Sequence, residues 1–325
     1  MKELKEEISA YLERKCHVEY DPANEIMVTV GGSEAIDIAM RAMLNPGEEV
    51  IIPQPSYVSY QPCVVLADGV PVIINLQEKN EFKLTAEELE AAITPKTKIL
   101  VLPFPNNPTG SIMTEEDLKP IAELCVKHDI FVISDEIYSE LTYEYPHTSI
   151  ASLPGMKERT VLINGFSKAY AMTGWRLGYA IAPKPLMDRI KQYHDFNAVG
   201  AASPLMEAAC VGLNMPDSYY EEFGAHYAHM KKLFTEGLDR IGIPYTDPQG
   251  AYFVLADIAP FLKPGQSDVD FCLEMAQKVG VACVPGTSFF NEKGINNIVR
   301  VHFAKKDETL NEALERLSHI KEKMG

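Results

Sequence analysis

The sequence predicts an α/β fold: a mostly parallel sheet between helices, followed by a smaller α+β lobe. Up to about residue 205 of the 325, short apolar runs alternate with stretches of helical periodicity. This alternation is typical of parallel sheets that are covered on both faces. Because the chain is longer than most single domains, we expect a large domain at 16–205 and a small domain at 206–325, which residues 1–15 can adjoin.

The predicted elements of the large domain follow in order. Residues 1–15 have apolar positions at helical spacing. Thr85 with Glu88 forms a capping box, and Thr114 opens another helix. Five runs read as buried strands: EIMVTV (25–30), EVIIP (49–53), VPVIINL (70–76), KILVLPF (98–104) and IFVISDE (130–136). Ligands of such sheets bind beyond the carboxyl ends of the strands.

The small domain combines longer helices with further strands. A helical region runs from 206 to 241, a second helix lies around DFCLEMAQKVG (270–280), and Asp307 opens the last one. Three runs are strand-like: GAYFVLADI (250–258), VACVPG (281–286) and NIVRVHFA (297–304). This mixture of helices and strands is typical of an α+β lobe.

Composition excludes several classes of function. A net charge of −16 with no clustered basic run is wrong for nucleic-acid binding. No apolar run approaches the ~18 residues of a membrane helix, and the first residues lack a signal-peptide core. The six cysteines form no CxxC or CxxH pattern, which indicates reduced thiols in the cytoplasm and no metal site.

Unusual polar residues stand at the ends of the predicted strands. Gly31-Gly32-Ser33 joins a strand to a helix, where free backbone N–H groups can hold an anion, although an N-cap without a ligand is the commoner explanation of such a triplet. Tyr57 can stack on a planar ring or merely pack. Asn107, in NNPTG, is a rigidly placed amide or an ordinary turn residue.

Charged residues extend this set. Asp135 ends an apolar strand, where burial would raise its pKa unless a cation compensates; alternatively it is a plain helix N-cap. Tyr138 follows one helical turn later. Lys168 and Arg176, eight positions apart, are solvated loop charges or a buried amine and an anion clamp. Arg300 interrupts a strand, where it needs an anionic partner or points to solvent. A single bound ligand, a phosphorylated pyridine aldehyde, would account for all of these residues.

Six segments in this order resemble the class I and II aminotransferases of fold type I: GGSEA, PSYVSY, NNPTG, SDEIY, FSKAYAMTGWRLGY and NIVRVHFA. The resemblance implies a pyridoxal-phosphate-dependent transaminase with a seven-stranded-type sheet. It also implies amino acid and 2-oxo acid substrates and a cytoplasmic homodimer. SDEIYSELTY followed by PHTSIA looks most like the aspartate, aromatic and N-acetyl-diaminopimelate aminotransferase branch.

The resemblance also implies a role for each residue. Lys168 would form the Schiff base with pyridoxal 5'-phosphate and later act as the general base. Asp135 would pair with the pyridine nitrogen, and Arg300 would clamp the substrate α-carboxylate. The remaining residues would hold the cofactor: Tyr138 and Asn107 at its phenolic oxygen, Tyr57 on the ring, and Gly32, Ser33, the Glu34 backbone, Ser167 and Arg176 at the phosphate. Asn107 would also border the substrate.

Two departures from the family pattern qualify this expectation. Family members carry a further segment before the helix in which this sequence begins, and GAASPLME (200–207) is more apolar than in relatives. We therefore expect the cofactor to bind and turnover to be impaired. A carbon–sulfur β-lyase is the closest alternative, because it shares the fold and the lysine. A non-catalytic cofactor-binding or dimerisation protein is a second.

Overall fold

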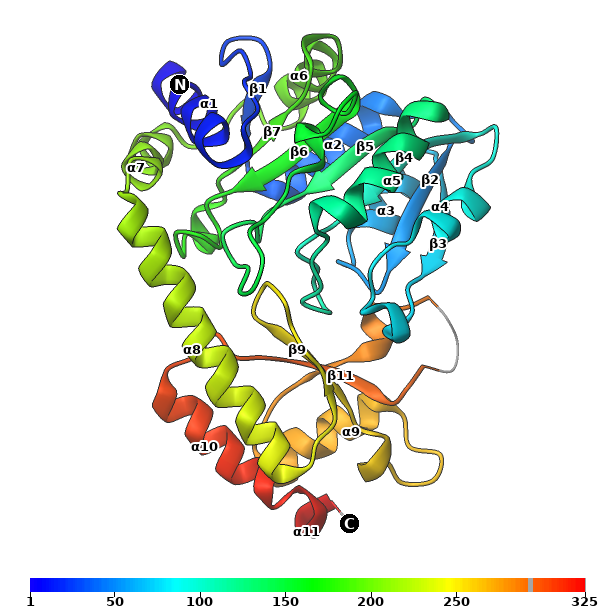
Figure 1. Cartoon of the computed structure of the whole chain (residues 1–325), viewed down its shortest axis with the longest axis vertical. Coiled ribbons are helices and arrows are strands. Elements are labelled where there is room, and N and C mark those ends of the chain that lie inside the picture. Colours follow the sequence, from blue (N-terminus) through cyan, green and yellow to red (C-terminus); the bar gives the residue numbers. More distant parts are fainter. Residues whose placement is uncertain (292–294, 325) are drawn as a thin grey trace.

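The computed structural model describes residues 1–291 and 295–324, which form two lobes with one sheet in each (Figure 1). The first lobe contains a seven-stranded sheet in the order β1-β7-β6-β5-β4-β2-β3, in which β7 runs antiparallel to its neighbours. Its strands are β1 (Ile26–Thr29), β2 (Glu49–Gln54), β3 (Val70–Asn75), β4 (Thr97–Leu102), β5 (Phe131–Asp135), β6 (Thr160–Gly165) and β7 (Gly178–Ile181). The predicted mostly parallel sheet is confirmed.

Helices cover both faces of this sheet. The inner strands therefore bury successive side chains on opposite faces, with Val50 and Val101 in one core cluster and Ile51 and Leu100 in another. The first cluster includes residues of α2 (Gly32–Met43), α3 (Tyr60–Leu66) and α6 (Lys184–Asn197), and the second those of α4 (Ala86–Ala92) and α5 (Glu115–Lys127). This two-sided burial explains the nearly continuous apolar runs in the sequence.

The first helix packs on the large lobe. Leu4 and Ile8 of α1 (Lys2–Cys16) share a core cluster with Ile181 of β7 and Met206 of α7 (Ser203–Leu213). The division of the chain at 16–205 and 206–325 stays a prediction, but α1 lies against the sheet of the first lobe.

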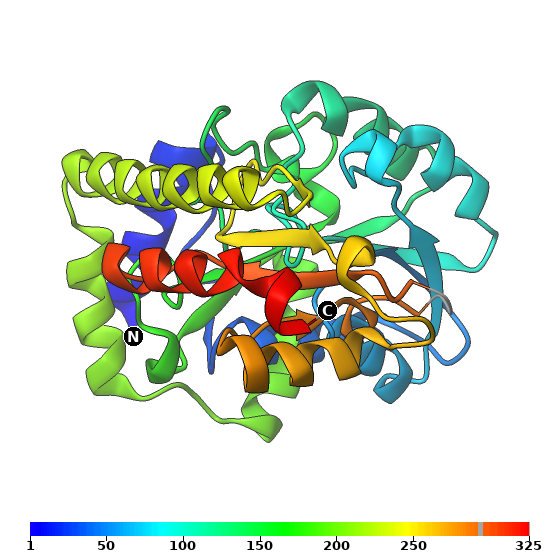
Figure 2. The ribbon, with the colours of Figure 1, turned by 90° about the horizontal axis from the view of Figure 1, so that it is seen from below.

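The second lobe contains a four-stranded antiparallel sheet in the order β10-β11-β9-β8. Its helices pack on this sheet, as the view from below shows (Figure 2). The strands are β8 (Tyr245–Thr246), β9 (Phe253–Asp257), β10 (Val284–Pro285) and β11 (Ile298–His302). The helices are α8 (Asp217–Ile241), α9 (Asp268–Glu274), α10 (Asp307–Ser318) and α11 (Ile320–Met324), and α9 continues as a π-helical turn over Met275–Val279.

The long helix α8 runs from the first lobe to the second (Figure 1). The sequence predicts one helical region from 206 to 241, but the structure has two helices, α7 and α8, separated at Asn214 to Pro216. Pro216 has no N–H to continue the hydrogen bonds of the helix, and it disfavours helical backbone in the residue before it. The break therefore lies at the proline.

The other elements agree closely with the sequence. The predicted capping box at Thr85 forms, and Thr114, predicted to open a helix, forms a second capping box with Asp117. α10 begins at Asp307, as predicted, with Lys306 as its N-cap, whereas VACVPG yields only the two-residue β10. Within residues 1–291 and 295–324, no helix has both the length and the apolar character that crossing a membrane requires.

Candidate active site

A cavity of about 640 Å³ is lined by residues of both lobes, among them residues at the carboxyl ends of the parallel strands. Ten of the residues singled out in the sequence line it: Gly32, Ser33, Tyr57, Asn107, Asp135, Tyr138, Ser167, Lys168, Arg176 and Arg300. The Glu34 side chain instead contacts His194 Nδ1 through Oε1, at 2.9 Å. The strand ends and the second lobe thus bring together residues that lie far apart in the sequence.

Asp135 ends β5 and is 8% exposed. Tyr60 Oη donates to its Oδ2 at 2.7 Å, and the Ile137 N–H donates to its Oδ1 at 3.2 Å. Burial raises the pKa of the Asp135 carboxyl, although these hydrogen bonds oppose the shift. No helix begins here, since the residues that follow form turns. The carboxylate therefore faces the cavity and does not cap a helix.

Lys168 lies in the loop between β6 and β7, and it is half-buried rather than solvated. Its Nζ donates to Tyr252 Oη at 3.0 Å and lies 5.4 Å from the centroid of the Tyr138 ring. The base of the loop is closed by Phe166 N–H, which donates to the Leu177 carbonyl. An amine is thereby held inside the cavity by a phenol from the second lobe.

One end of the cavity is suited to an anion. Gly31 has a φ of 79°, which favours glycine, and a Cβ there would lie 2.5 Å from Arg176 Nη2, so the guanidinium packs directly on the glycine backbone. Gly32 begins α2, whose N-terminus offers free N–H groups. Arg176 Nη1 donates to the Thr173 carbonyl at 2.9 Å. Across the described part of the chain, Arg176 forms no salt bridge.

Arg300, on β11 of the second lobe, also lines the cavity. Its Nη1 donates to Asn107 Oδ1 at 2.7 Å, and its Cζ lies 4.4 Å from the Phe253 ring centroid and 4.9 Å from that of Phe289. Burial lowers the pKa of this guanidinium. Residues 1–291 and 295–324 offer it no carboxylate partner, only the amide oxygen. A partly buried guanidinium between two aromatic rings is suited to a carboxylate ligand.

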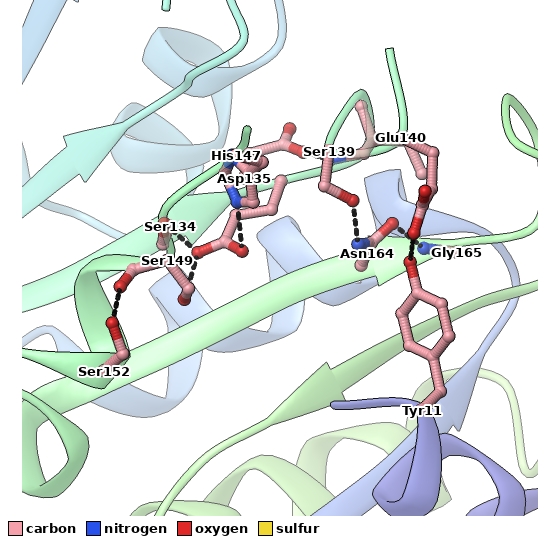
Figure 3. A network of polar contacts seen from close by, with 12 residues as sticks. Tyr11, Ser134, Asp135, Ser139, Glu140, His147, Ser149, Ser152, Asn164 and Gly165 are labelled. Atoms are coloured by element: carbon pink, nitrogen blue, oxygen red, sulfur yellow. Dashed lines mark hydrogen bonds and ion pairs between the residues drawn. The ribbon is translucent and has the colours of Figure 1, made fainter. Parts of the chain in front are cut away.

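A buried polar network supports the segment that carries Asp135 and Tyr138. Glu136, 1% exposed, accepts from Ser134 Oγ at 2.8 Å and from Ser149 Oγ at 2.7 Å, and it contacts His147 Nε2 at 2.7 Å. Figure 3 shows Ser134, His147 and Ser149 gathered beside Asp135. In the same view Tyr11, from α1, contacts Glu140.

Sequence reasoning missed several residues of the cavity, namely Tyr60, Thr173, Tyr227, Tyr252 and His302. Tyr60 does lie within the segment PSYVSY, and Tyr252 lies within the predicted strand GAYFVLADI. No spacing pattern marks either as functional, because their hydrogen-bond partners lie 75 and 84 positions away in the chain.

Comparison with known proteins decides the family. The family model for class I and II aminotransferases matches residues 1–317. The aspartate aminotransferase of Pyrococcus abyssi is 40% identical over 98% of this chain and 81% of its own length. This chain belongs to the class I and II aminotransferases. YugH of Bacillus subtilis, named only as an aminotransferase, is 45% identical to it over the same shares of both chains.

The fold of this aminotransferase agrees with solved structures of the family. The aromatic aminotransferase of Pyrococcus horikoshii superimposes with a TM-score of 0.92 at 39% identity, over 99% of this chain and 86% of that one. Members of the family depend on pyridoxal phosphate and transfer amino groups between amino acids and 2-oxo acids. The predicted family, cofactor and reaction are thus confirmed.

The cavity of this aminotransferase fits pyridoxal phosphate. A half-buried amine, Lys168, is available for the aldehyde, and a buried carboxylate, Asp135, has no salt bridge within the described residues. The glycine backbone at residues 31 and 32 lies beneath the Arg176 guanidinium, as a phosphate requires. The donor set therefore matches each polar end of the cofactor.

Proposed function

We propose that this aminotransferase holds its cofactor in the cavity between the lobes and uses Lys168 as the catalytic amine. One observation carries this proposal: Asp135, Arg176 and Arg300 line a single cavity around Lys168, and none of them has a salt bridge among the described residues. Asp135 is buried and Arg300 is half-buried, and charges in such places are costly without partners, whereas Arg176 is exposed. Ligand groups of opposite charge would remove this cost.

The roles of the residues follow from their places. Asp135 would hold the proton of the pyridine nitrogen, while Tyr138 and Asn107 would bind the phenolic oxygen and Tyr57 would stack on the ring. The phosphate would lie at the other end, held by Gly32, Ser33, the Glu34 backbone, Ser167 and Arg176. When bound, the cofactor supplies an electron sink for the carbanion formed at Cα of the substrate.

The chain itself positions the substrate and moves its proton. Arg300 would bind the α-carboxylate through its planar fork, while the rings of Phe253 and Phe289 exclude water from that ion pair. Lys168 Nζ would take the Cα proton and later return it. General acid–base steps of this kind contribute ~10²- to 10⁴-fold to the rate. By fixing the carboxylate, Arg300 also determines which Cα bond faces the catalytic amine.

We also propose that the protein works as a homodimer in the cytoplasm. Large apolar side chains are exposed outside the cavity, among them Trp175 at 43%, Phe196 at 94% and Val199 at 82%. Exposed apolar surface of this kind is characteristic of interaction sites. The six described cysteines are all free thiols, which agrees with a reducing compartment.

Titration of the purified protein with single amino acids, followed by visible absorption, tests the proposed reaction. In the absence of a 2-oxo acid acceptor, a donor should convert the aldehyde form of the cofactor to its amine form and release one 2-oxo acid per site. Multiple turnovers with release of ammonia, for example from cystathionine, would contradict transamination. Steady-state rates with the same amino acids test the prediction of impaired turnover.

A further inference from the structure

We propose that Tyr252 is a positioning residue for the transfer reaction: its hydroxyl holds the Lys168 amine whenever that amine is not bonded to the cofactor. The inference rests on the catalytic role proposed for Lys168. It concerns a residue of the second lobe that neither the sequence motifs nor the family resemblance singles out.

The contact between the two side chains joins the lobes. Lys168 Nζ donates to Tyr252 Oη at 3.0 Å, and within residues 1–291 and 295–324 this is the hydrogen bond that the amine forms. The other close groups are the faces of two aromatic rings, with the amine 5.4 Å from the Tyr138 centroid and 5.6 Å from the Tyr252 centroid. Ring faces attract a cation but direct it weakly. The phenolic oxygen therefore supplies the directional contact.

Tyr252 is itself held in place on several sides. Its ring packs edge-on against Tyr138 at 5.5 Å and stacks on Tyr227 of α8 at 6.0 Å, with interplanar angles of 82° and 25°. Its carbonyl accepts from Phe303 N–H at 3.1 Å, and the N–H of the preceding Ala251 donates to the Leu141 carbonyl at 2.8 Å. The backbone is thus tied to both lobes. The hydroxyl is fixed before the amine reaches it.

The chemistry explains why such a partner is useful. When an amino acid displaces Lys168, the freed amine must stay within ~2.6–3.2 Å of the groups between which it moves a proton. A free lysine side chain has ~2 kcal/mol of rotamer entropy to lose. Tyr252 accepts a hydrogen bond from the amine and keeps its own proton, so no covalent bond changes at the phenol. The amine is confined, and proton transfer stays with Lys168.

Replacing Tyr252 with phenylalanine removes the hydroxyl and keeps the ring. The control is Tyr245→Phe, which removes a phenol of the second lobe that lies outside the cavity and bonds Asp239 instead of Lys168. In the cofactor-free protein, acylation of Lys168 by acetic anhydride at pH 8 can be followed by peptide mass analysis. Because the hydrogen bond to Tyr252 restrains and occupies the amine, we expect Lys168 to react about tenfold faster in Y252F and at the wild-type rate in Y245F.

A second measurement uses the cofactor-loaded protein. With an amino acid deuterated at Cα, Y252F should slow the single-turnover half-reaction about tenfold or more and increase its isotope effect, with little change in KM. Unchanged acylation and an unchanged isotope effect, or identical effects in Y245F, would overturn the proposal.

Failure of the proposed function can be distinguished from failure of the role of Tyr252, because the acylation assay needs no cofactor. If wild-type Lys168 carries no cofactor after borohydride reduction, the catalytic role of Lys168 fails. If Lys168 carries the cofactor and only the effects of Y252F are absent, the role of Tyr252 alone fails.

Discussion

At the scale of single residues, the buried Asp135 carboxylate is unfavourable for the fold. Burial raises its pKa, so the folded chain keeps this proton at a pH where the unfolded chain has released it. The contribution of Asp135 to stability therefore falls as the pH rises through the raised pKa. A cationic ring nitrogen of the bound cofactor would stabilise the charged Asp135 carboxylate and so reverse this loss of stability. Asp135 is thereby linked to cofactor binding.

Asp135→Asn should separate these two effects. We expect the cofactor-free variant to melt at a higher temperature than the wild type at pH 7.5, by a margin that shrinks toward acid pH. Added pyridoxal phosphate should stabilise only the wild type. Thermal melts with and without cofactor measure both effects, and the exposed Asp195→Asn serves as the control. A cofactor-free variant that melts below the wild type at pH 7.5 would contradict this explanation.

Gly178 offers a steric test of the anion site. A Cβ at this position would lie 2.5 Å from the Gly32 N and 2.6 Å from the Gly31 carbonyl carbon, so alanine must displace the backbone of that site. We expect G178A to lose about 1–3 kcal/mol of unfolding free energy and to bind the cofactor more weakly. G174A is the control, because no atom lies within 4 Å of its Cβ. Wild-type cofactor affinity in G178A, measured by fluorescence titration, would argue against a phosphate at this backbone.

At the scale of elements, α8 contains two glycines in opposite surroundings. At Gly237 a Cβ would lie 2.3 Å from Leu314 Cδ1 of α10, whereas at Gly224 it would meet nothing within 4 Å. Gly237 therefore allows the close packing of α8 on α10. Gly224 has no such function and only lowers the helix propensity.

Replacing glycine with alanine should therefore change the stability of the protein in opposite directions at these two positions of α8. G224A should stabilise the protein by roughly 0.5–1 kcal/mol, because alanine is the better helix former. G237A should destabilise it by about 1–3 kcal/mol, because α10 must move to make room. Chemical denaturation of both variants measures the two changes. Stabilisation by G237A would show that the two helices adapt without cost.

The elements also show why part of the structure follows from the sequence. The buried strands could be predicted because both of their faces are covered, so that almost every residue in them is apolar. The strand ends then placed Asp135 and Asn107 near one another. The partners of these residues could not be predicted in this way: Tyr60 reaches Asp135 and Tyr252 reaches Lys168 only through tertiary packing. The short β10 likewise depends on its pairing with β11 and not on its own propensity.

At the scale of the whole molecule, the proposed homodimer requires an interface. Phe196, at the end of α6, is 94% exposed, and Val126, on α5 at the opposite face of the sheet, is 42% exposed. If the surface around α6 contacts a second copy, a charge at 196 must be desolvated on association. A charge at 126 stays in water.

We therefore expect F196D to weaken self-association by at least about tenfold and V126D to leave it unchanged. Sedimentation over a range of protein concentrations measures both dissociation constants. A dimer that tolerates F196D would place the interface elsewhere, and a wild-type monomer would reject the dimer.

The central claim is that Lys168 attaches the cofactor of this aminotransferase. Borohydride reduction of the loaded protein, followed by digestion and peptide mass analysis, tests it most directly, with Lys168→Arg as the matched variant. We predict a cofactor-derived mass on the peptide that contains Lys168, close to one per chain, and none in K168R. An adduct on another lysine, or no adduct in the wild type, would contradict it.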